Sequence, residues 1–106
     1  MEETCVVMVS LDDRKKAEAI CETLVRERLA ACCHLLPSGL SIYWWDDAVQ
    51  REEETLMLLK TRATLFEPLR SRVAELHPYD VPEIVALPIS EGHAPYLEWL
   101  CRETRA

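Results

Sequence analysis

A strand-like run followed at once by a strongly helical pattern is the feature that most constrains this fold. Residues 4–10 are mostly valine and other apolar residues, which is typical of a buried strand. Between Asp12 and Leu29, apolar residues recur every three or four positions and so predict a helix with one buried face; they are Ala17, Ile20, Cys21, Leu24, Val25 and Leu29. An Asp at the start of this segment can cap the helix. A strand that leads directly into an amphipathic helix predicts a mixed α and β fold.

The middle of the chain predicts a long hairpin. Residues 31–36 and 40–45 have strand character, and Pro37-Ser38-Gly39 between them suits a bend or a bulge. Asp46-Asp47 fits a hairpin tip, and the returning strand is expected over residues 53–61. The run Glu52-Glu53-Glu54, where this returning strand begins, is interpreted as a solvated hairpin flank in preference to a metal clamp.

The last third of the chain completes the order of elements. Thr64 and Glu67 fit a capping box, which predicts a second helix that ends at His77-Pro78. Residues 83–87 form a further strand bracketed by prolines, which places it at an edge or at strand ends. A short helix follows over residues 96–100. The resulting βαββαβ order predicts an α+β, ferredoxin-like antiparallel sheet with two helices on one face and a short C-terminal helix.

Size and charge exclude several classes of protein. A chain of 106 residues is the size of a single domain, 1–106, and a domain this small gains from assembling into an oligomer. Twelve basic against 19 acidic residues give a net charge of −7, whereas nucleic-acid binding requires basic side chains at the phosphates. We therefore expect no nucleic-acid partner.

The same sequence predicts a cytoplasmic protein with no membrane partner. The longest uncharged stretch, residues 29–45, is interrupted by Pro37 and Gly39 and is too short to span a bilayer. Glu2 and Glu3 open the chain where a secretory signal would be basic. Five cysteines at irregular spacings do not suggest a disulfide framework, so reduced thiols are expected, with Cys21 in the core.

Signatures of catalysis are scarce. With only two glycines, the chain has neither a glycine-rich phosphate loop nor a nucleophile elbow. Cys33 and His34 are adjacent and would point to opposite faces of a strand, which makes them a poor catalytic pair. Cys32 and His34 are two residues apart and share a face, so they are a possible metal-ligand pair, although burial of Cys32 is the more common outcome.

The most distinctive segment runs from His77 to Glu83. Its two prolines predict a rigid, extended loop that displays His, Tyr, Asp and Glu side chains for binding. The structural alternative is that His77 ends a helix, Tyr79 packs, and Glu83 pairs with Lys60. The residues alone leave these two interpretations open.

The aromatic run Tyr43-Trp44-Trp45 also permits two interpretations. It can form an apolar surface buried by a partner subunit, or it can line an aromatic ligand pocket. In so small a chain, burial by a partner subunit is favoured.

Together these motifs resemble those of the CutA divalent-cation tolerance proteins. They occur in the family's order across nearly the whole chain: Glu27-Arg28-Leu29-Ala30-Ala31-Cys32, Pro37, Ser41-x-Tyr43-x-Trp45, Lys60-Thr61, His77-Pro78-Tyr79-x-x-Pro82-Glu83, Pro88, Gly92 and Tyr96-Leu97-x-Trp99. The resemblance implies a homotrimer, similar in architecture to the PII signalling proteins, in which long hairpins pair with neighbouring subunits. It also implies a link to tolerance of divalent metals, copper above all, without a settled enzymatic activity.

The resemblance implies a metal site only in part. His77 matches a histidine proposed as a copper ligand in the family, but Leu76 and Val9 stand where some members have a second His and a Cys. His34 stands where many members have Asn and offers another nitrogen ligand.

We therefore expect a homotrimer that binds a divalent metal, with Cu(II) favoured, through ligands among His77, Cys32, His34 and Glu83. The alternative is a PII-like trimeric scaffold or signalling protein that binds a small ligand or a partner protein at inter-subunit clefts. An enzyme is the least favoured hypothesis.

Overall fold

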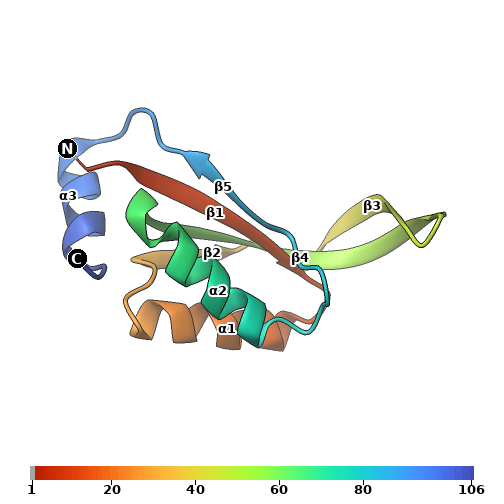
Figure 1. The fold of residues 1–106 in the computed structure, drawn as a ribbon. Helices are drawn as coiled ribbons and strands as arrows, with labels where there is room; N and C mark the ends of the chain where they lie inside the picture. The colour runs from red at the N-terminus through yellow and green to blue at the C-terminus, as the bar shows by residue number, and fades with distance from the viewer. Residues whose placement is uncertain (1) are drawn as a thin grey trace.

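The computed structural model describes residues 2–106 as an antiparallel sheet covered on one face by two helices (Figure 1). The elements are β1 (Thr4–Leu11), α1 (Arg14–Arg26), β2 (Cys32–Leu35), β3 (Gly39–Trp45), β4 (Ala48–Arg62), a 3₁₀ turn (Ala63–Leu65), α2 (Phe66–Leu76), β5 (Ile84–Pro88) and α3 (Ala94–Arg102). The strand order is β2-β4-β1-β5, and β3 pairs with the other half of β4. The expected ferredoxin-like α+β fold is confirmed. In the part of the chain that the structure describes, no helix is long and apolar enough to cross a membrane.

The core lies between the sheet and helices α1 and α2. Alternate residues of a strand face the same side, so Val7 and Val9 of β1 and Met57 and Leu59 of β4 all point toward the helices and are fully buried. The residues between them, such as Leu58 and Lys60, face the other side of the sheet and are only half-buried. We call that second side the open face. Along the edge strand β5, Val85 and Leu87 lie on this side and are about half exposed.

A bulge divides the long second strand of the fold into β2 and β3. Leu35 lies opposite Met57 and Gly39 lies opposite Glu54, so four steps on one strand match three on the other. The extra residue falls at the predicted Pro37-Ser38-Gly39 position. Beyond it, β3 and β4 form a hairpin that extends past the helices in Figure 1. Its tip is the expected Asp46-Asp47 turn, in which both residues have positive φ.

The helix starts differ in detail from the sequence prediction. Asp13 caps α1 by accepting a hydrogen bond from the Lys16 backbone N–H at 3.1 Å. The predicted capping box at Thr64 is wrong: this residue lies in the 3₁₀ turn, where its hydroxyl is 3.3 Å from a carboxylate oxygen of Glu2. Among the described residues, no side chain caps α2, which begins at Phe66.

Two further expectations are corrected. Cys21 and Cys33 form a disulfide between α1 and β2, so the prediction of five reduced thiols is wrong for this pair. The packing of α1 on β2 brings their Cα atoms to 6.0 Å, a distance that a disulfide can span. The spacing of the two cysteines along the chain does not reveal this proximity.

The predicted pairing of Glu83 with Lys60 is either within one subunit or across the trimer; the pairing within one chain is wrong, whereas a pair between subunits stays a prediction. Lys60 lies opposite Val6 near the start of β1, whereas the Glu83 carboxylate contacts the Ser10 hydroxyl near the end of β1 at 3.4 Å. Four residues of extended strand separate Val6 from Ser10, on the order of 13 Å.

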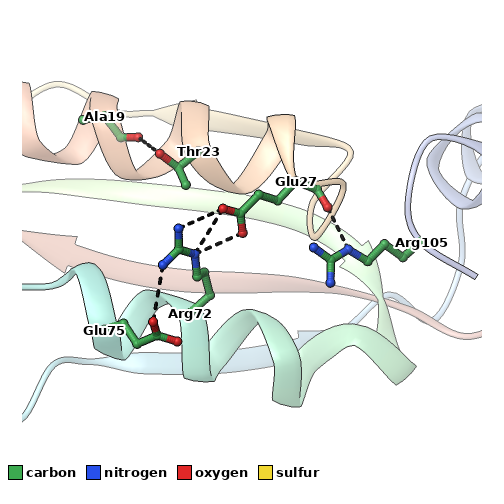
Figure 2. Close-up of polar contacts among 6 residues, drawn as sticks. All are labelled: Ala19, Thr23, Glu27, Arg72, Glu75 and Arg105. Carbon is green, nitrogen blue, oxygen red and sulfur yellow. Dashed lines mark hydrogen bonds and ion pairs between the residues drawn. The ribbon is translucent and has the colours of Figure 1, made fainter.

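An ion pair between Glu27 and Arg72 ties the two covering helices together (Figure 2). The Arg72 guanidinium donates to both carboxylate oxygens of Glu27 at 2.8 to 3.2 Å and also reaches Glu75. The backbone carbonyl of Glu27 accepts from Arg105 at 2.8 Å, which attaches the C-terminal segment to the same point. The hydrogen bonds from Arg72 lower the pKa of Glu27 below its usual value.

This pair predicts a pH-dependent stability. Because the pKa of Glu27 is lower in the folded protein than in the unfolded chain, the pair stabilises the fold above the unfolded pKa and ceases to do so as pH falls through the folded pKa. We expect Glu27→Gln to have a lower melting temperature than the wild type at about pH 7. This difference should shrink as the pH falls through the lowered pKa of Glu27 in the folded protein. The matched control is Glu18→Gln, which removes an exposed i,i+4 partner of Arg14 and should have little effect at neutral or acidic pH. An equal loss for Glu27→Gln at neutral and acidic pH would contradict an electrostatic role.

Candidate functional site

A cavity of about 750 Å³ lies where the end of β1, the base of the β3–β4 hairpin and the loop after α2 meet. Six carboxylates line it: Asp12, Asp46, Glu52, Glu54, Asp80 and Glu83. Within residues 2–106, its lining includes no lysine, arginine or histidine. The cavity is therefore strongly acidic and suits a cationic ligand.

The hairpin register explains why two of these carboxylates face the cavity. Gly39 lies opposite Glu54 and Ser41 lies opposite Glu52, and alternate residues of a strand share a face. Glu53 lies between them and is exposed. The interpretation of the three glutamates as a solvated flank fits Glu52 and Glu53, which are both exposed, whereas Glu54 is half-buried. Glu52 and Glu54 also line the cavity.

Tyr79 fixes the loop against the cavity wall. Its hydroxyl donates to the Glu54 carboxylate at 2.8 Å and accepts a hydrogen bond from the Asp12 backbone N–H at 3.1 Å. Burial raises the pKa of Tyr79, and the hydrogen bond and charge of Glu54 raise it further. The pKa of Tyr43 is raised as well, first by loss of water and then by the charges of Glu52, Glu54 and Asp12. The two tyrosines thus remain protonated and can donate hydrogen bonds at neutral pH.

His77 lies beneath this loop and is only 6% exposed. Its Nδ1 accepts a hydrogen bond from the Tyr79 backbone N–H at 3.1 Å, which leaves the proton on Nε2, 2.8 Å from the Ser10 carbonyl oxygen. The neutral ring also packs edge-on against Tyr79, with centroids 4.6 Å apart. Because both ring nitrogens bond to the backbone, coordination of a metal by His77 requires that one of these bonds be given up.

The four residues expected as ligands lie in two places. His77 and Glu83 both contact Ser10, through its carbonyl and its hydroxyl respectively, and Glu83 lines the cavity. Cys32 and His34 lie on β2, on the open face, opposite Lys60 and Leu58. Among residues 2–106, no three His, Cys, Asp or Glu side chains are close enough to hold one metal ion.

Sequence reasoning missed most of the acidic cavity. Asp12, Asp46, Glu52 and Glu54 come from two separate connections and one strand. Nothing in their spacing along the chain joins them to Asp80 and Glu83, which the sequence predicts only as side chains displayed by the loop after His77. The available signal was indirect: in the predicted topology, the first strand ends, the hairpin begins and the His77 loop passes at the same end of the sheet.

Comparison with known proteins identifies the family. Residues 5–103 match the model of the "CutA1 divalent ion tolerance protein" family. The chain belongs to this family. It is 48% identical over 99 residues to the divalent-cation tolerance protein CutA of Thermus thermophilus, a match that covers 93% of this chain and 96% of that protein. It is 44% identical over 100 residues to the chloroplastic CutA of Arabidopsis thaliana. That match covers 94% of this chain and 55% of the Arabidopsis protein.

Solved CutA1 structures share the fold. The structure of the divalent cation tolerance protein Cut A1 from Thermus thermophilus superposes with a TM-score of 0.93 at 48% identity, covering 99% of this chain and all of that one.

The contacts of His77 predict a structural contribution that can be measured apart from metal binding. His77→Ala would leave the partly buried Ser10 carbonyl and Tyr79 N–H without their partners, at a cost of about 1 to 3 kcal/mol of unfolding free energy. His93→Ala is the matched control, because His93 is exposed, and its removal should change stability by less than about 0.5 kcal/mol. Chemical denaturation of the metal-free protein measures both. Equal stabilities of the two variants would contradict the structural role.

Proposed function

We propose that this protein is a homotrimer that binds a divalent metal ion, with Cu(II) favoured, at the acidic cavity. The observation that carries the proposal is the lining of that cavity by six carboxylates in a chain of the divalent ion tolerance family. The proposed role is binding, and it needs no catalytic group.

The donor set supports a metal site that one chain does not complete. Carboxylate oxygens bind divalent cations, and Cu(II) accepts oxygen together with nitrogen ligands. Glu83 is the expected ligand with the fewest constraints, since it is exposed and, within residues 2–106, its carboxylate accepts one hydrogen bond, from the Ser10 hydroxyl at 3.4 Å. Because three such groups do not converge within residues 2–106, the bound ion would keep water ligands or take further ligands from a second subunit.

The proposed trimer is supported by the β3–β4 hairpin. Leu40, Ile42 and Trp44 form an apolar stripe along β3, which Val49 extends onto β4, and each is 54% to 73% exposed. The β4 residues opposite Ile42 and Leu40 on this face are Arg51 and Glu53. A two-stranded ribbon is marginally stable alone, and a contiguous apolar surface of this kind marks an interface. Pairing with neighbouring subunits, as the family resemblance implies, would bury this face.

Assembly has a direct test. Light scattering should give three times 12.2 kDa for the wild type. Trp44→Asp places a charge within the apolar face and is expected to lower the mass toward that of one chain, because a buried unpaired charge is strongly unfavourable. Trp44→Phe keeps an aromatic ring and should keep the wild-type mass. A monodisperse wild-type monomer at micromolar concentration would contradict the trimer.

Metal binding is tested by calorimetric titration with Cu(II) and Zn(II). Glu83→Gln keeps the shape of the side chain and removes its charge, so we expect Cu(II) affinity to fall about tenfold. Glu98→Gln is the matched control, because Glu98 is an exposed carboxylate on α3 outside the cavity. Unchanged affinity in Glu83→Gln would remove Glu83 from the site.

Variants of the other three expected ligands, His77, Cys32 and His34, are titrated with Cu(II) in the same way. His77→Ala should also weaken Cu(II) binding about tenfold, either as a ligand or because it releases Tyr79 from the cavity wall. A loss confined to Cys32→Ala and His34→Ala would move the metal to the open face and contradict the cavity as its site.

The PII-like alternative, a trimeric scaffold for a small ligand or a partner protein, keeps one specific observation in its favour. Tyr43, Trp45 and Tyr79 line the same cavity and present aromatic surface to it. Saturable binding of an organic cation, with no Cu(II) binding, would favour this second function.

A further inference from the structure

Lys60 is a positive charge in an unusual position. It lies on the open face of β4, between the buried residues Leu59 and Thr61, and its side chain is half-buried. Its ammonium is 3.4 Å from Nδ1 of His34 and 5.8 Å from the centroid of the Tyr96 ring. Among residues 2–106, no carboxylate lies within 4.0 Å of it.

The other half-buried basic side chains are all paired. Arg62 binds Glu2, Arg70 binds Glu67 and Arg72 binds Glu27, at 2.7 to 2.8 Å. The remaining lysines and arginines are exposed, and water solvates them. Lys60 is thus the one basic side chain in the described residues that is partly withdrawn from water without a carboxylate. This is not for want of acidic residues, since the chain has 19.

The groups around Lys60 can donate hydrogen bonds. Cys32 lies directly opposite Lys60 in the β2–β4 ladder, and its Sγ is 3.5 Å from the Tyr96 hydroxyl. Trp99 packs beside Tyr96 on α3, with ring centroids 5.5 Å apart, and holds the phenol over the sheet. Burial and the contact with Cys32 raise the pKa of Tyr96 to about 12, so its hydroxyl keeps its proton at neutral pH.

We propose that Lys60, His34 and Tyr96 form a binding site for an anionic oxygen group, a carboxylate or a phosphate, on the open face of the sheet. An ammonium, an imidazole and a phenol hydroxyl supply charge and donors to such a group, and charge-assisted hydrogen bonds are the strong ones. The bound anion would compensate the half-buried ammonium.

This site is separate from the acidic cavity. Lys60 pairs with Val6, about four residues along β1 from the Ser10 hydroxyl that contacts Glu83. An ammonium 3.4 Å from Nδ1 of His34 also repels a divalent cation there, so the open face and the cavity favour ligands of opposite charge. The anion site does not depend on metal binding.

The anion can come from solution or from a carboxylate of a second copy of this chain. To test for an anion from solution, the wild-type protein is titrated with inorganic phosphate and with citrate. Binding is followed by calorimetry and by tryptophan fluorescence, to which Trp99 beside Tyr96 contributes. Lys60→Met should weaken binding about tenfold or more, and Tyr96→Phe, which keeps the ring and removes the hydroxyl, severalfold. Lys16→Met removes the same charge from an exposed position on α1 and should bind like the wild type.

If the anion is a carboxylate of a second copy of the chain, we expect the wild type to bind neither phosphate nor citrate. The quantity to measure is then the dissociation constant of the oligomer. Lys60→Met should then raise this constant about tenfold or more on dilution, measured by light scattering, with Lys16→Met unchanged. Thermal melting of each variant shows that it is folded. If Lys60→Met alters neither anion binding nor assembly relative to Lys16→Met, the proposal is overturned.

Discussion

The two-residue alternation of strand β4 organises the whole molecule. This strand of 15 residues starts in the projecting hairpin and ends in the helix-covered sheet (Figure 1), so its side chains lie in several different environments. In its second half, Met57 and Leu59 enter the core while Lys60 faces the open side. In its first half, Glu52 and Glu54 line the cavity, whereas Val49 lies on the opposite face of the hairpin beside Trp44. A shift of one residue in register would exchange every one of these positions.

The bulge between β2 and β3 permits this arrangement. A long second strand without an extra residue would keep a single alternation against β4 from Cys32 to Trp45. The insertion at residues 36–38 resets the register, so that Ser41 and Tyr43 lie opposite Glu52 and Gln50. Acidic and aromatic side chains consequently meet on one side of the hairpin, where the loop after α2 closes the cavity with Tyr79.

Charge is distributed unevenly over this acidic chain. Carboxylates gather at the end of β1, where burial and then their negative charges raise the pKa of Tyr43 and Tyr79. Elsewhere most half-buried charges are paired, as Glu27 is with Arg72 between the helices. Lys60 belongs neither to the carboxylate cluster nor to the paired charges. We therefore propose the open face as a second site, one that favours an anion where the cavity favours a cation.

The sequence by itself determined the order and type of the elements, because hydrophobic periodicity, proline positions and turn residues act over short distances. Asp13 at the start of α1, the bulge at Pro37-Ser38-Gly39 and the Asp46-Asp47 turn are such local features. Tertiary structure alone decided the pairings between distant residues. Cys21 joins Cys33 and Glu83 contacts Ser10 in place of Lys60, while His77 uses both ring nitrogens on the backbone. The acidic cavity belongs to the same class, since its carboxylates come together only where strand register, helix packing and a proline-stiffened loop fix three connections at one end of the sheet.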